Sequence, residues 1–186
     1  MSQQSRRAVI ALSVCIGLMA VISVSWFVKL RMRPTHLRVV KVDRPLPELA
    51  LQRMNGTPIA SSELRGRVTV LDFWGTWCPP CVEEMPVLNE LATRYSSNPT
   101  VQILLVNPEM YGDAPGKIRT FLRKRDIAIP AALDPSHTCF EIGPMQFPTT
   151  LVIDRRGHIR YERTGYSGAD SMRRELREEV DELLSQ

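Results

Sequence analysis

The stretch Asp72-Phe-Trp-Gly-Thr-Trp-Cys-Pro-Pro-Cys81 decides how the rest of this 186-residue sequence is interpreted. It follows apolar and β-branched residues that begin at Val68 and predict a buried strand, and it precedes a helical pattern. A Cys-x-x-Cys pair at a strand-to-helix junction places its first sulfur at the helix N-terminus, where unpaired N–H groups and the helix dipole stabilise a thiolate. We therefore predict that Cys78 is a nucleophile and that Cys81, one turn later, is its resolving thiol.

The residues around the cysteine pair support this interpretation. Asp72 lies on the predicted strand, so its carboxyl group is expected to be buried beneath the cysteines with a raised pKa. The alternative is a purely structural role, in which Asp72 is only hydrogen-bonded with a hydroxyl group or water. Pro148 precedes another predicted strand, where an X-Pro bond is a candidate cis peptide. The predicted packing around the sulfurs comes from Trp74, Trp77, Pro79 and Pro80.

The rest of the pattern alternates strands and helices. We predict strands at 68–73, 101–106, 149–153 and 158–163, and helices at 80–95, 117–125 and 170–184. This order predicts an α/β fold in which a mixed central sheet is flanked by helices. The roughly 140 residues of this part are enough to bury about two-thirds of the unfolded surface without disulfide cross-links.

The N-terminal part has a different character. Residues 8–28 contain no charged residue, and such a stretch is long enough to cross a hydrocarbon core of about 30 Å. We predict a short tail at 1–7, one transmembrane anchor or uncleaved signal at 8–30, a basic linker at 31–45, and the folded domain at 46–186. A cleaved signal peptide is the alternative, because Arg6 and Arg7 precede an apolar stretch to Ile22, and small residues follow in Ser23-Val24-Ser25.

The charges near the apolar stretch give conflicting indications about orientation. More Lys and Arg residues follow the stretch than precede it, which would keep the domain in the cytoplasm. Long domains cross membranes largely regardless of such charges, however, and disulfide chemistry suits an oxidising compartment. We therefore predict a single-pass protein of the inner (cytoplasmic) membrane whose domain faces the periplasm or the cell exterior. The formal net charge of +4, without a basic and aromatic stripe, argues against nucleic-acid binding.

The sequence resembles the thioredoxin superfamily, and within it the membrane-anchored TlpA-like and ResA-like thiol-disulfide oxidoreductases. The resemblance extends from about residue 45 to the C-terminus and rests on residues 46–49, 55–56, 72–81, 83–86, 148–154 and 157. It implies a thioredoxin-like fold in which Cys78 attacks and Cys81 resolves. It also implies that Pro148 is a cis-proline packed against the cysteines and that Asp72 is the buried acid.

The resemblance has implications for function as well. It implies disulfide-containing protein substrates, a membrane thiol carrier as electron donor, and a connection with cytochrome c maturation. Glu109 resembles an acidic residue that part of this group places near the site, and it is a second acid/base candidate after Asp72. The expected function is reduction of disulfides in extracytoplasmic proteins, without a cofactor. The Pro-Pro dipeptide does not decide the direction of electron transfer, because related couples span about −270 to −120 mV.

A metal-binding module is the alternative function. Cys78, Cys81, His137 and Cys139 are residues of the types that bind zinc, and such a module would hold or deliver a metal for oxidase assembly. The two prolines between the cysteines and the strand-to-helix setting favour redox chemistry instead, so we predict no metal ligand. Metal content and insulin reduction distinguish the two functions.

Overall fold

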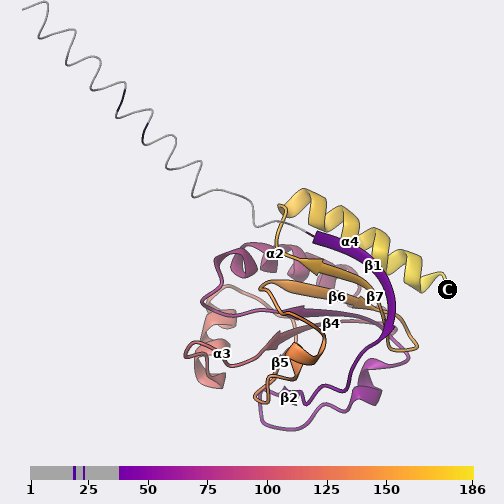
Figure 1. Cartoon of the computed structure of the whole chain (residues 1–186), viewed down its shortest axis with the longest axis horizontal. Helices are drawn as coiled ribbons and strands as arrows, with labels where there is room; N and C mark the ends of the chain where they lie inside the picture. The colour runs from indigo at the N-terminus through magenta and orange to yellow at the C-terminus, as the bar shows by residue number, and fades with distance from the viewer. Residues whose placement is uncertain (1–18, 20–22, 24–37) are drawn as a thin grey trace, which may run out of the picture. The chain divides into compact units, whose positions relative to one another are not determined.

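The structure, a computed structural model, describes Met19, Ser23 and residues 38–186 (Figure 1). The predicted tail, nearly all of the predicted transmembrane segment and the first part of the predicted linker lie outside the described residues. Among the described residues, no helix has both the length and the apolar character needed to span a membrane.

A seven-stranded sheet forms the centre of residues 38–186 (Figure 1). The strands are β1 Arg38–Pro45, β2 Gln52–Arg53, β3 Val68–Phe73, β4 Val101–Asn107, β5 Ala131–Leu133, β6 Thr149–Ile153 and β7 His158–Thr164. Their order across the sheet is β1-β7-β6-β3-β4-β5-β2. The central strand β3 pairs in parallel with β4 and antiparallel with β6, which confirms the predicted mixed sheet.

The predicted basic linker is wrong from Arg38 onward. Residues 38–45 form β1, an edge strand of 8 residues that pairs antiparallel with β7. Val40 and Val42 are half-buried, whereas their neighbours Val39, Lys41 and Asp43 are exposed. The alternation of β-branched residues therefore outweighs the local positive charge. Pro45 is tolerated because it ends a strand at the sheet edge. The sheet therefore includes residues that precede the predicted domain boundary at 46.

Three helices cover one face of the sheet. They are α2 Pro79–Arg94, α3 Pro115–Lys124 and α4 Ala169–Leu184, and their buried residues share one core cluster with Val68 and Val70 of β3. The opposite face packs against Leu49, Leu51 and residues of two 3₁₀ turns, η1 Ser61–Leu64 and η2 Thr138–Glu141. All three helices were predicted to within two residues at each end. This layering confirms the predicted α/β class and places the start of α2 directly after β3.

Candidate active site

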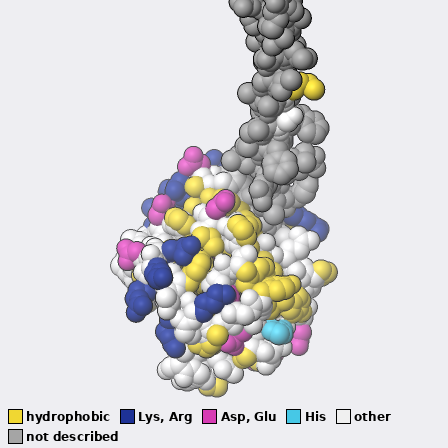
Figure 2. All heavy atoms as spheres, turned by 90° about the vertical axis from the view of Figure 1, so that its left-hand side faces the viewer, with side chains coloured by type: hydrophobic (Ala, Val, Ile, Leu, Met, Phe, Trp, Pro, Cys, Tyr) yellow, Lys and Arg dark blue, Asp and Glu magenta, His cyan; other side chains and the backbone are white. Residues whose placement is uncertain are grey.

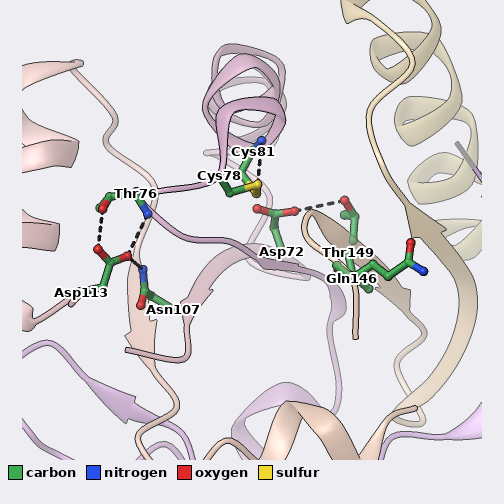
Figure 3. Close-up of a disulfide and its surroundings, with 9 residues drawn as sticks. Asp72, Thr76, Cys78, Cys81, Asn107, Asp113, Gln146 and Thr149 are labelled. Carbon is green, nitrogen blue, oxygen red and sulfur yellow. Dashed lines mark hydrogen bonds between the residues drawn. A yellow bond between two sulfur atoms is a disulfide. The ribbon is translucent and has the colours of Figure 1, made fainter. Parts of the chain in front are cut away.

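The two cysteines lie where the chain passes from β3 into α2 (Figure 3). Cys78 is the N-cap of α2 in an extended conformation, and Pro79 and Pro80 occupy the first helical positions, where a missing N–H group is tolerated. Cys78 and Cys81 form a disulfide, and the Cys81 N–H donates to Cys78 Sγ at 3.3 Å. The exposed fraction is 3% for Cys78 and 0% for Cys81. Cys78 is therefore the sulfur that an external thiol or disulfide reaches first.

The carboxyl group of Asp72 points toward this disulfide from the underlying strand (Figure 3). Asp72 is fully buried, and one of its oxygens accepts a hydrogen bond from the Thr150 hydroxyl at 3.1 Å. Its other oxygen accepts no hydrogen bond from an N–H or hydroxyl group of the described residues, and the further side chain that interacts with Asp72 is Glu84. Burial raises the pKa of Asp72 to about 7. Asp72 therefore has both the hydroxyl partner and the raised pKa that were anticipated. The raised pKa allows Asp72 to exchange a proton near neutral pH.

Glu84 is a second buried carboxyl group near the site, and the sequence interpretation missed it. It lies on α2, one turn after Cys81, and is fully buried. No N–H or hydroxyl group of the described residues donates to its oxygens, and its side-chain hydrogen-bond partner is the carboxyl group of Asp72. Burial first, and then the charge of Asp72, raise the pKa of Glu84 well above its usual value. Two coupled buried carboxyl groups strongly disfavour the doubly ionised state, so the pair retains a proton at neutral pH.

The burial of Glu84 could have been predicted from its spacing to apolar residues of the same helix. Glu84 lies three residues after Cys81 and four before Leu88, and both of these side chains are fully buried. Residues at these spacings share one face of a helix, so Glu84 belongs to the buried face of α2.

Glu109 occupies a different position from the one implied by the resemblance. It lies after β4 in a left-handed conformation (φ 55°), and its backbone N–H donates to the Asn107 side chain at 2.8 Å. Its side chain makes no hydrogen bond or ion pair with the described residues. Glu84 is thus the acidic residue that interacts with Asp72, and the structure provides no contact that supports Glu109 as the acid or base.

Asp113 organises the loop that contains Glu109 (Figure 3). The buried carboxylate of Asp113 accepts hydrogen bonds from the Thr76 N–H at 2.8 Å, from the Thr76 hydroxyl, and from the Asn107 amide at 2.9 Å. Burial alone would raise the pKa of Asp113, but these donors and Lys117 lower it below its usual value. The loop after β4 is therefore fastened to the turn that carries the cysteines.

Aromatic rings form a rim beside the disulfide. Trp77 is half-buried, and its ring makes edge contacts with Tyr111 at 4.6 Å and Phe147 at 5.2 Å between centroids. The Phe147–Pro148 peptide bond is cis, as predicted. Trp74 is fully buried in the core. The remaining two predicted packing residues differ: Pro80 is half-buried, whereas Pro79 is exposed and contributes little packing.

The structure does not assemble the alternative zinc site. Cys139 shares a core cluster with Phe73, whereas the disulfide belongs to the cluster that contains Val70. Residues of one strand that differ by an odd number point to opposite faces, so the sheet separates Cys139 from the disulfide. Cys139 is fully buried, and burial raises its pKa to about 12. Among the described residues, no group of three or more His, Cys, Asp or Glu side chains is arranged to hold a metal ion.

Comparisons with known proteins agree with this geometry. Residues 41–180 match the Redoxin family. The thiol-disulfide oxidoreductase ResA of Geobacillus kaustophilus (strain HTA426) is 32% identical over 145 residues, which cover 76% of this chain and 80% of that protein. A Chlorobium tepidum structure assigned as a thiol:disulfide interchange protein DsbE has a TM-score of 0.66 at 28% identity, covering 79% of this chain and 99% of that one. A secreted thiol-disulfide isomerase from Corynebacterium glutamicum shares the fold, with a TM-score of 0.68 at 20% identity over 80% and 92% of the two chains.

Proposed function

The chain belongs to the Redoxin family and is a ResA-like thiol-disulfide oxidoreductase with a thioredoxin-like fold, and from this premise we propose that it is a membrane-anchored reductase of disulfides in extracytoplasmic proteins. The observation that carries the proposal is the Cys78–Cys81 pair at the start of α2, above two buried carboxyl groups. Anchoring rests on the uncharged stretch at 8–28, and orientation rests on the oxidising compartment that disulfide chemistry suits. Maturation of c-type cytochromes rests on the family resemblance.

The first step uses the reduced cysteine pair, which a membrane thiol carrier regenerates. The Cys78 thiolate attacks one sulfur of a target disulfide, so a bond forms between Cys78 and that sulfur while the target S–S bond breaks. The second target sulfur leaves as a thiolate and takes a proton from solvent. The free N–H groups and the dipole at the start of α2 stabilise the attacking thiolate.

The second step uses the buried carboxyl groups. An ionised carboxylate of the Asp72–Glu84 pair accepts the proton of the Cys81 thiol. The Cys81 sulfur then bonds to Cys78 Sγ, which breaks the mixed disulfide and releases the target sulfur as a thiolate. The target leaves reduced and the enzyme leaves oxidised, in the disulfide form described above. Because the pair holds one proton and exchanges another near neutral pH, it is able to act as the base for this transfer.

Substrate binding is assigned to the aromatic rim. Tyr111 exposes 73% of its surface beside Trp77, and the view from the α3 side shows hydrophobic side chains gathered next to Lys and Arg residues (Figure 2). Such a rim suits an extended polypeptide with an apolar side chain near its disulfide, and contact with the peptide backbone makes selection for sequence weak.

A trapping experiment tests the proposed function. The full-length Cys81→Ser variant is expected to accumulate a mixed disulfide through Cys78 when it meets oxidised insulin or a disulfide-containing haem-site peptide. The matched Cys78→Ser variant is expected to form none, and wild-type protein is expected to reduce insulin at the expense of dithiothreitol. Insulin reduction that survives in Cys78→Ser, or stoichiometric metal on wild-type protein without thiol exchange, would overturn the proposal.

A further inference from the structure

Asp72 is one of three residues that lie side by side across the sheet. In the β3–β6 ladder Asp72 is paired with Thr150, and in the β6–β7 ladder Thr150 is paired with Arg163. Directly opposed residues on neighbouring strands project to the same face. Thr150 and Arg163 therefore face the helix-covered side of the sheet, together with the acid beneath the disulfide.

Arg163 is a cation buried in this layer. It is only 2% exposed, and its guanidinium donates to Glu175 at 2.6 Å and to Glu179 at 2.8 Å, both on α4. Arg163 Nε and one carboxylate oxygen of Glu179 have no partner among the described residues. Replacing a buried ion pair with apolar side chains is often neutral or stabilising. Stability alone is thus a weak reason for an arginine here.

The charge of Arg163 acts on one buried carboxyl group of α2 and on one of α4. On the α2 side, burial and Asp72 raise the pKa of Glu84, and the Arg163 guanidinium opposes them. On the α4 side, burial raises the pKa of Glu179 to about 7, and Arg163 again acts in the opposite direction. The positive charge therefore favours ionisation of either carboxyl group, and the two groups share one guanidinium.

Other groups near this layer contribute smaller effects. The β6 strand contributes the uncharged Thr150 hydroxyl, which donates to Asp72. The remaining charged or titratable groups that act on the cluster or its neighbours are Glu83, Tyr166, Asp170, Arg173, Arg174 and Glu178. Glu178 is exposed on α4 next to Glu179, which makes it a matched control.

We propose that Arg163 and Glu179 are positioning residues of the redox site, which couple the ionisation of the buried Asp72–Glu84 pair to the side chains of α4. An ionised Glu179 offsets the guanidinium charge, so the pair beneath the disulfide keeps its proton more firmly. A neutral Glu179 leaves the guanidinium paired with the single carboxylate of Glu175, so more of its positive charge favours proton loss from the Asp72–Glu84 pair. The ionisation state of Glu179 thereby changes the fraction of the Asp72–Glu84 pair that is able to accept the proton of Cys81. Only this catalytic consequence rests on the proposed function.

The test is a pH titration of side-chain carboxyl carbons by ¹³C NMR, on the full oxidised chain. Glu179→Gln is expected to lower the titration midpoint of the Asp72–Glu84 pair by about 0.5 to 1 pH unit, because it removes an anion that competes for the guanidinium. Arg163→Gln is expected to raise the midpoint by at least as much, and Arg163→Lys, which keeps the charge, by less. The control Glu178→Gln is expected to leave the midpoint nearly unchanged.

Glu179→Gln and Arg163→Gln each break the same ion pair, but they are expected to shift the titration midpoint in opposite directions. A purely structural role of the ion pair would not give shifts of opposite sign. Shifts in the same direction, or an unchanged midpoint in folded Glu179→Gln, would overturn the proposal. Should Arg163→Gln fail to fold, Glu179→Gln and Arg163→Lys still decide the outcome. The titration needs no electron transfer, so its failure is distinguishable from failure of the trapping experiment.

Discussion

Replacing Asp72 by Asn is expected to stabilise the folded chain, and increasingly so as the pH rises. The folded pKa of Asp72 is about 7, and its usual value is 3.8. Between these values the folded state holds a proton that the unfolded state has lost, so the stability of the wild type falls as pH rises through this window. Asparagine keeps the shape of the side chain and an oxygen for the Thr150 hydroxyl, and it removes this titration.

The magnitude follows from the size of the pKa difference. A difference of about 3 units, at 1.36 kcal/mol per unit, corresponds to about 4 kcal/mol once Asp72 is fully ionised. Asp72 is fully buried, so solvent screening does not reduce this value substantially. Glu84 also loses a like charge in the variant, which adds to the gain at high pH in the same direction.

The assay is urea denaturation of the oxidised full chain at several values between pH 4 and pH 8. The stability difference between Asp72→Asn and wild type is expected to grow by about 4 kcal/mol across that range. Asp126→Asn, at an exposed position with a left-handed backbone, is the matched control for the change of Asp to Asn itself. A difference for Asp72→Asn that stays constant with pH would refute the reasoning.

Three further predictions concern the surroundings of the site. Asp113→Ala is expected to cost about 2–3 kcal/mol in urea denaturation, because the buried Asn107 amide and a backbone N–H lose their acceptor; a loss below about 0.5 kcal/mol would contradict this. In the folded chain at pH 8, Cys139 is expected to resist iodoacetamide until denaturant is added, because burial raises its pKa; rapid labelling, detected by peptide mass, would show that the thiol is accessible. Gly75→Ala is expected to raise the KM for insulin, because the new Cβ would lie 2.5 Å from ring atoms of Trp77 and displace the rim; an unchanged KM would remove Trp77 from substrate binding.

The central strands and the cysteine site were predictable because their signals are local. The apolar run of β3, the Cys-x-x-Cys spacing and the helical periodicity after it each lie within a few residues. By contrast, β1 was missed because Lys, Arg and Pro residues obscured the alternation of Val40 and Val42, and its pairing with β7 depends on a distant segment. The strand β5 has only 3 residues, too few for any periodic signal.

The buried charges were harder to predict than the cysteines. Arg163 continues the buried alternation of Ile159 and Tyr161 in β7, so its position was readable, but a charged residue at an inward position is usually taken as exposed. Its partners lie on α4, and nothing local in the sequence indicates that ion pair. Predicting that Glu84 is buried likewise required giving more weight to its position on the helix than to its charge. In each case, burial becomes evident only when separate elements pack together.

The equilibrium reduction potential of the Cys78–Cys81 couple tests the proposed reductase most directly. It is measured on the full chain against dithiothreitol and glutathione buffers, with Cys139→Ser as a control that should give the same value. A potential below about −220 mV is predicted, because a reductant must transfer electrons to disulfides of more oxidising potential. A potential above about −150 mV would make the protein an oxidant or an isomerase and would contradict the proposed direction of electron transfer.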